Sequence, residues 1–144
     1  MIRRYLLLVF ILLVGVSLAC HRLRATQATH GASSGDQILA RALEERARNL
    51  RVEGEGLVIK LLPDDREGDR HQCFIVRLRS GQTLLIAHNI DQAPRVASLQ
   101  EGDTVAFSGE YEWNAKGGVI HWTHQDRGGR HPAGWLKHNG HIYQ

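Results

Sequence analysis

The stretch TVAFSGEYEW, residues 104–113, is the clearest indication of the fold in the sequence. Every second residue of it is apolar or small, and the set comprises Val105, Phe107, Gly109, Tyr111 and Trp113. This alternation has the two-residue period of a strand with one buried face. The turn sequence NAKGG (114–118) and the run VIHWT (119–123) follow, so we expect a hairpin of two antiparallel strands.

Three more segments with strand character precede this hairpin, at residues 57–62, 71–79 and 83–90. Turn residues separate them, and a longer connection, residues 91–103, leads to the fourth strand. Five strands in this order, with the long connection between the third and the fourth, predict a small OB-like barrel. A different small antiparallel barrel or a sandwich is the alternative.

The barrel has a predicted element on each side. Apolar residues at three- and four-residue steps predict a helix over residues 36–50, with Asp36 as its N-cap. The stretch WLKHNGHIY, residues 135–143, predicts a C-terminal hairpin whose Asn139-Gly140 pair favours a type I′ turn. We therefore expect a mainly β fold, in which residues 51–144 form one barrel domain with a C-terminal hairpin.

Residues 1–19 have the layout of a secretory signal peptide. Two arginines precede the uncharged run Tyr5–Ala19, whose 15 residues are fewer than the roughly 20 that cross a bilayer. The run ends in small residues before Cys20, which resembles a lipoprotein processing site, so Cys20 is the predicted lipidation site. We expect export to the periplasm or cell envelope, with residues 20–35 as a flexible tether. Ordinary cleavage without lipidation and an uncleaved anchor are the alternatives.

Composition and charge limit the classes of protein to which the chain can belong. The 144 residues allow one domain, and 42% apolar residues are enough for a core. The formal charge of +3 falls to +1 (16 basic against 15 acidic) once the first 19 residues are removed, which does not by itself indicate a polyanion partner. All nine histidines lie beyond residue 19, so full protonation would raise the charge to about +10, and we expect any anion binding to tighten at lower pH. We expect Cys73 to be a buried free thiol and the protein to be a monomer.

One candidate binding surface follows from the barrel type. OB barrels bind oligonucleotides or oligosaccharides around strands two and three. The residues there that could hold an anionic oligomer, with two tryptophans that could stack on a base or sugar, are Arg77, Arg79, His88, Asn89, Trp113 and Trp122. The alternative is that both tryptophans fill the core. The preferred hypothesis is an exported binding module without a cofactor, and a protein-interaction domain is an alternative.

A second candidate site is the histidine-rich C-terminal segment. Its possible ligands for a divalent transition metal are His121, His124, Asp126 and His131. If the strand continues to residue 126, His124 and Asp126 share a face while His121 points to the other. This set would serve a metal-dependent hydrolase or phosphodiesterase. The alternatives are structural histidines and an Asp126 that closes a local turn. No nucleophile elbow, P-loop, dinucleotide fingerprint or HExxH motif is present.

Several stretches together resemble an uncharacterised bacterial family of short exported proteins, a domain of unknown function. They are LLPDD (61–65), HQCFIVRL (71–78), SGQTLLIAHNID (80–91), EGDTVAFSGEYEWNAKGGVIHWTHQD (101–126) and GRHPAGWLKHNGHIYQ (129–144). The resemblance implies export and an OB-like barrel, and it implies no activity. Similar proteins tend to have His where Gln125 stands and Pro where Arg127 stands, which weakens a metal site based on a His-His pair there.

Overall fold

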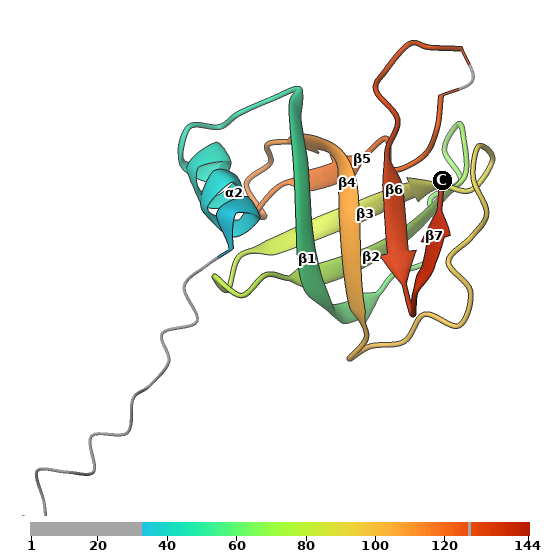
Figure 1. Cartoon of the computed structure of the whole chain (residues 1–144), viewed down its shortest axis with the longest axis horizontal. Coiled ribbons are helices and arrows are strands. Elements are labelled where there is room, and N and C mark those ends of the chain that lie inside the picture. The colour runs from blue at the N-terminus through green and yellow to red at the C-terminus, as the bar shows by residue number, and fades with distance from the viewer. Residues whose placement is uncertain (1–32, 127) are drawn as a thin grey trace, which may run out of the picture. The chain divides into compact units, whose positions relative to one another are not determined.

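The computed structural model describes residues 33–126 and 128–144. The predicted signal peptide, the lipidation site Cys20 and the tether up to residue 32 lie outside these ranges. The described elements are one helix and seven strands (Figure 1): α2 (Ser34–Glu44), β1 (Leu50–Leu61), β2 (His71–Arg77), β3 (Thr83–Asn89), β4 (Thr104–Glu112), β5 (Val119–His121), β6 (Trp135–His138) and β7 (His141–Tyr143).

The first five strands form a closed barrel. Their order is β1-β2-β3-β5-β4, and β1 closes the ring by pairing with β4. The β3–β5 pair is parallel and the other pairs are antiparallel. This is the small five-stranded barrel that the sequence predicts, with an OB-like arrangement. Gly54 allows the backbone of β1 to lie close to the Phe107 ring, because a Cβ at this position would be only 2.7 Å from that ring.

The C-terminal hairpin is confirmed in both its strands and its register. In β6 and β7, His138 pairs with His141 and Leu136 pairs with Tyr143. The turn residues Asn139 and Gly140 have φ angles of 48° and 81°, as a type I′ turn requires. β6 continues the sheet by pairing with β4, so the hairpin lies beside the barrel.

The helix differs from its prediction at both ends. It begins after Ser33, whose hydroxyl accepts the Asp36 backbone N–H at 3.1 Å, so Ser33 and not Asp36 is the N-cap. It ends at Glu44, and β1 begins at Leu50, seven residues before the predicted strand start at residue 57. Ala47 and Leu50 pack against the core although they lie after the end of the helix. Their spacing in the sequence fits a helical period, which is why the predicted helix extends too far.

The fifth strand is shorter than predicted. It ends at His121, because Trp122 has a φ of 51° that takes the chain out of the extended conformation. The strand does not continue to residue 126, so the condition under which His124 and Asp126 would share a strand face is not met.

The core lies inside the barrel and under α2. Its strand residues are Val52, Val58, Phe74, Val76, Leu84, Ile86, Val105, Phe107, Tyr111, Ile120 and Leu136. Leu39 and Ala42 of α2 join this core, and the backbone N–H of Ser80 in the β2–β3 turn donates to Asp36 at 3.1 Å. The helix thus covers the barrel end at which β2 finishes, and the start of β2 lies at the opposite end. In the part of the chain that the structure describes, no helix has both the length and the apolar character needed to cross a membrane.

Candidate functional site

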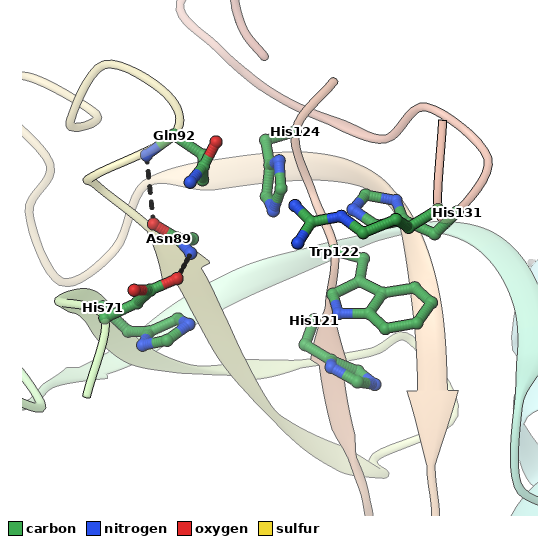
Figure 2. A pocket seen from close by; sticks show the side chains of 9 residues that line it. His71, Asn89, Gln92, His121, Trp122, His124 and His131 are labelled. Atoms are coloured by element: carbon green, nitrogen blue, oxygen red, sulfur yellow. Dashed lines mark hydrogen bonds between the residues drawn. The ribbon is translucent and has the colours of Figure 1, made fainter. Parts of the chain in front are cut away.

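A pocket of about 260 Å³ lies at the barrel end opposite α2, and Figure 2 shows its lining residues from close by. It is formed where β2 begins and where the parallel strands β3 and β5 end. Its lining consists of Asp69, His71, Asn89, Gln92, His121, Trp122, His124, Arg130 and His131. We call this site the rim pocket.

Two histidines of the rim pocket are held by backbone carbonyls. Nδ1 of His124 lies 2.8 Å from the Gln125 carbonyl oxygen, and Nδ1 of His131 lies 2.9 Å from that of Pro132. A carbonyl only accepts, so Nδ1 carries the proton in each ring and the Nε2 of a neutral ring keeps its lone pair. The two rings are edge to face with centroids 5.0 Å apart. His131 also stacks on Trp122 at 4.3 Å, so this wall of the pocket is continuous.

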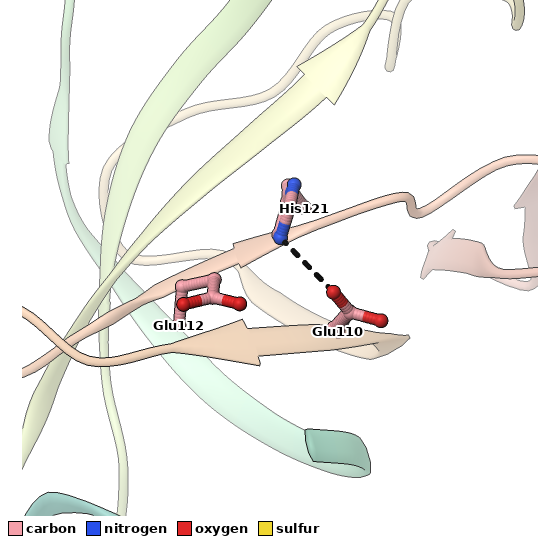
Figure 3. A group of neighbouring side chains, drawn as sticks. All are labelled: Glu110, Glu112 and His121. Atoms are coloured by element: carbon pink, nitrogen blue, oxygen red, sulfur yellow. Dashed lines mark ion pairs between the residues drawn. The ribbon is translucent and has the colours of Figure 1, made fainter. Parts of the chain in front are cut away.

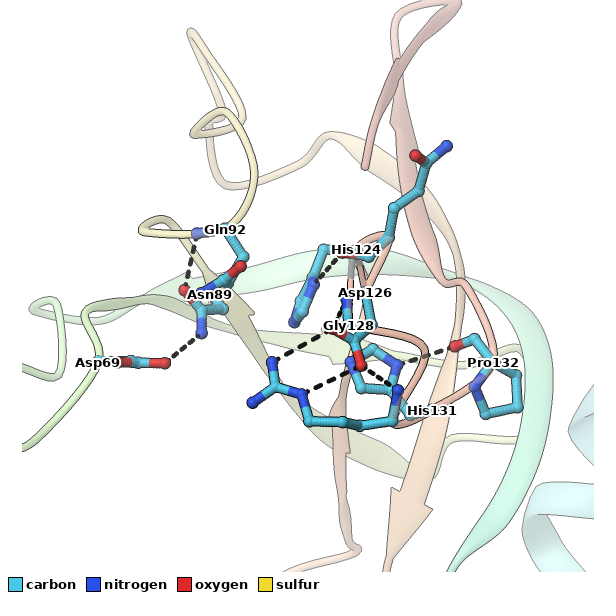
Figure 4. A network of polar contacts seen from close by, with 10 residues as sticks. Asp69, Asn89, Gln92, His124, Asp126, Gly128, His131 and Pro132 are labelled. Atoms are coloured by element: carbon cyan, nitrogen blue, oxygen red, sulfur yellow. Dashed lines mark hydrogen bonds and ion pairs between the residues drawn. The ribbon is translucent and has the colours of Figure 1, made fainter.

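The opposite wall depends on Asn89 (Figure 4). Its side-chain amide donates to the Asp69 carboxylate at 3.0 Å, and its carbonyl oxygen accepts the backbone N–H groups of Asp91 and Gln92. One side chain therefore fixes the end of the β1–β2 connection against the start of the β3–β4 connection. His71 lies on this side of the pocket, across from His131 (Figure 2).

His88 lies within the barrel close to the pocket wall and is fully buried. Its Nδ1 is 2.8 Å from the Thr123 hydroxyl, and its Nε2 is 3.1 Å from the Pro94 carbonyl oxygen. Burial lowers the pKa of His88 to about 4, against the opposing effect of the Pro94 carbonyl. The structure thus places this predicted ligand residue in a structural role, joining β3 to the segment after β5.

Asp126 closes the turn that carries Arg130 and His131. Its carboxylate accepts the backbone N–H groups of Gly128 and Arg130 and both Nε and Nη2 of the Arg130 guanidinium, the last two at 3.2 Å. These hydrogen bonds, led by that of the guanidinium, hold the pKa of Asp126 well below its usual range. The turn reading of Asp126 is confirmed, and its oxygens are already occupied.

The predicted binding residues are divided between the two ends of the barrel. Asn89 and Trp122 line the rim pocket, whereas Arg77 and Arg79 lie near Glu55 in a shallow depression at the far end. Arg77 is six residues from His71 along β2, which amounts to about 20 Å of strand. Trp113 is partly buried against the core, with the Arg46 guanidinium 5.0 Å from its ring centre. The six residues therefore do not form one surface.

The predicted metal ligands are only partly brought together. His121, His124 and His131 all line the rim pocket, but they and Asp126 do not place three ligand atoms within 4.8 Å of one another. Pocket residues that the sequence analysis missed are Asp69, His71, Gln92 and Arg130. They come from three separate segments, and no local pattern indicates that barrel closure brings them together.

Comparison with known proteins identifies the family. No curated protein matches the chain at a significant level. A family model described as "Protein of unknown function (DUF3465)" matches residues 22–144, which is most of the chain and includes every described element. The chain therefore belongs to the DUF3465 family of proteins of unknown function.

Proposed function

We propose that the protein is an exported cell-envelope module that binds an anionic oligomer, and that the rim pocket holds one anionic group of this ligand. The observation that carries the proposal is the orientation of His124 and His131, whose Nδ1 protons are bound to carbonyls. A proton gained by either ring must therefore go to Nε2. Protonation gives each ring a second donor, and a charged N–H group binds phosphate or carboxylate oxygens more strongly than a neutral one does.

The charge of the rim pocket makes this binding depend on pH. With neutral histidines, Asp69 contributes −1 while Arg130 and its partner Asp126 cancel, which gives a net charge of −1. Protonation of His71, His124 and His131 adds three positive charges and gives +2. His121 contributes less, because burial lowers its pKa. The pocket therefore favours an anion only when its histidines are charged.

The proposed location of the protein is inferred from its sequence. The uncharged run Tyr5–Ala19 and the following Cys20 support export, with lipidation of Cys20 attaching the domain to a membrane. Mass spectrometry of the mature protein tests this part separately. An unmodified Cys20 at the N-terminus would rule out the lipid anchor, and an intact Met1 would rule out cleavage.

The binding proposal is tested by titrating the purified protein with a single-stranded oligonucleotide and, separately, with an acidic glycan. We expect binding of one of them to be tighter at about pH 5.5 than at about pH 7.5 and weaker at high salt. His131→Gln should weaken it, and Asp69→Asn should strengthen it by removing a repulsive charge. Arg77→Gln, at the far end of the barrel, is the matched control and should leave it unchanged.

Three results would count against the proposal: no binding of either ligand at low salt, binding that does not change with pH, or a larger loss with Arg77→Gln than with His131→Gln. The last result would instead favour the far end of the barrel, where Arg79 lies 3.7 Å from Glu55.

The hydrolase alternative built on His121, His124, Asp126 and His131 has weaker support. A metal at that set would have to displace Arg130 and two backbone N–H groups from the Asp126 carboxylate. Such a step would break several hydrogen bonds to a charged group, so this carboxylate is a poor candidate ligand.

A further inference from the structure

We propose that Glu110, Glu112 and His121 form a binding site for one divalent transition-metal ion on the outer face of the barrel (Figure 3). This site is separate from the anion-binding groups of the rim pocket, and it shares only His121 with the pocket lining. It is also distinct from the set His121, His124, Asp126 and His131.

The register of two strands brings the three side chains together. Glu110 and Glu112 are two residues apart on β4, so they share a face, while Tyr111 between them points into the core. Glu110 pairs directly with His121 of β5. The three ligand atoms, one from each side chain, lie within 4.8 Å of one another. Two rigid strands thus place the site, and no loop has to fold over it.

One pair of ligand atoms lies close to the spacing that metal ligands have and too far apart for a hydrogen bond. Nε2 of His121 lies 3.7 Å from Oε1 of Glu110, beyond hydrogen-bonding range. Two ligand atoms that are each about 2.1 Å from a tetrahedral ion are about 3.4 Å apart. A shift of a few tenths of an ångström would therefore bring this pair to the distance that one ion requires.

The imidazole nitrogen of this site has no hydrogen-bond partner among the described residues. Nε2 of His121 is inaccessible to solvent and makes no hydrogen bond with the described residues. A buried polar atom without a hydrogen bond destabilises the fold, and a bound ion is one partner that would satisfy it. Burial also lowers the pKa of His121 despite the nearby carboxylates, which keeps the ring in the neutral form that binds metals.

The carboxylates are also incompletely neutralised. Arg51 is paired with Glu110 across β1 and β4, but its guanidinium donates to the Ser108 hydroxyl and the Ala133 carbonyl. The Glu110 carboxylate, whose side chain is 13% exposed, accepts no hydrogen bond within the described ranges. Glu112 accepts the backbone N–H of Asn49 through Oε1, and its Oε2 lies 3.9 Å from Arg48.

The ligand set indicates which ion to expect. One imidazole nitrogen and two carboxylate oxygens suit Zn²⁺ and Mn²⁺, and such sites bind Zn²⁺ more tightly than Mn²⁺. Three protein ligands leave a fourth tetrahedral position for water or another ligand. We therefore expect an open zinc site.

The test is calorimetric titration of Zn²⁺ into full-length protein that carries no affinity tag and has been stripped with a chelator, at about pH 7. Histidines elsewhere in the chain can bind zinc weakly, so variants define the site. Glu110→Gln and Glu112→Gln keep the side-chain shape, and each should weaken the tightest zinc binding by at least about 10-fold. Glu53→Gln, an exposed glutamate on β1, and His131→Gln in the rim pocket should leave it unchanged.

A second readout identifies the ligand environment directly. Co²⁺ replaces Zn²⁺ in tetrahedral sites, and its visible absorption should be lost in the two glutamine variants while their circular dichroism stays that of the folded protein. Unchanged zinc affinity in both variants would overturn the proposal, as would a loss confined to His131→Gln. Absence of zinc binding by the wild-type protein would also overturn it. Since His131→Gln is expected to affect only anion binding, this site and the rim pocket can fail independently.

Discussion

The buried His88 makes the stability of the barrel sensitive to acid. Its Nε2 faces the Pro94 carbonyl and so carries the proton, while Nδ1 accepts from the Thr123 hydroxyl, and the neutral ring satisfies both partners. Burial lowers its pKa from 6.5 to about 4 in the folded protein. Between these values the unfolded chain binds more protons than the folded one. The contribution of His88 to stability is therefore complete above pH 6.5 and is lost as the pH falls toward 4.

The size of this loss follows from the two pKa values. The full shift corresponds to about 3 kcal/mol once the pH is below about 4. At about pH 5, where the folded ring is still mostly neutral and the unfolded ring is charged, the loss relative to pH 7.5 is about 2 kcal/mol. A small domain has a total stability of about 5–15 kcal/mol, so this loss is measurable.

The assay is urea unfolding of the wild type and of His88→Gln at about pH 7.5 and about pH 5. Glutamine does not titrate, so the variant should lose about 2 kcal/mol less than the wild type between the two pH values. All other groups titrate in both proteins and cancel in the comparison. Ile86→Val, a destabilising substitution on the same strand, should keep the pH dependence of the wild type. An equal loss in wild type and His88→Gln would show that His88 is not the source of the acid sensitivity.

Three further predictions concern the buried Gly118 and Asp36 and the Cys73 thiol, which is half-buried and not fully buried as the sequence predicts. Gly118→Ala should prevent stable folding, because a Cβ there would overlap the Tyr111 ring and φ is 109°; a thermal melt resembling that of the wild type would contradict this. Asp36→Ala should lower the free energy of unfolding by about 1–3 kcal/mol, since the Ser80 N–H loses its acceptor, and urea unfolding measures the change. The Cys73 thiol should react slowly with iodoacetamide in the folded state and quickly in urea, because burial raises its pKa; equal rates by mass spectrometry would show that the thiol is accessible.

The strands and the C-terminal hairpin could be predicted because their signals are local. Alternation identifies β4 from its own residues, and Asn139-Gly140 fixes the register of β6 and β7 through its backbone preference alone. The exact start of β1 could not be predicted, because its first half is defined by pairing with β4, more than 50 residues away. Ala47, which packs on the core without being helical, shows the same dependence on distant contacts.

The rim pocket could be predicted only in part for the same reason. The density of histidines from His121 onward indicated His121, His124 and His131 as candidate ligands, and the structure places all three in the lining of one pocket. Sequence does not reveal that His88 satisfies both ring nitrogens inside the barrel, or that Asp126 is bound to Arg130. Glu110 was visible only as a polar position on the outer face of a strand, and its relation to His121 required the pairing of β4 with β5.

The closure of the barrel by β1 and β4 also determines how the chain can fold. This ladder pairs Leu50 with Tyr111, so the start of the first strand cannot pair on this edge until a residue 61 positions later has been made (111 − 50). Forming contacts between residues so distant in sequence has a large entropic cost of loop closure, and this cost lowers the folding rate. Until residue 111 is available, the β1–β2–β3 sheet has two unpaired edges that can associate with other chains. A nascent chain that stops within β4 is therefore an open sheet that is prone to associate with other chains. The residues from β4 onward close this sheet into a barrel and remove its unpaired edges.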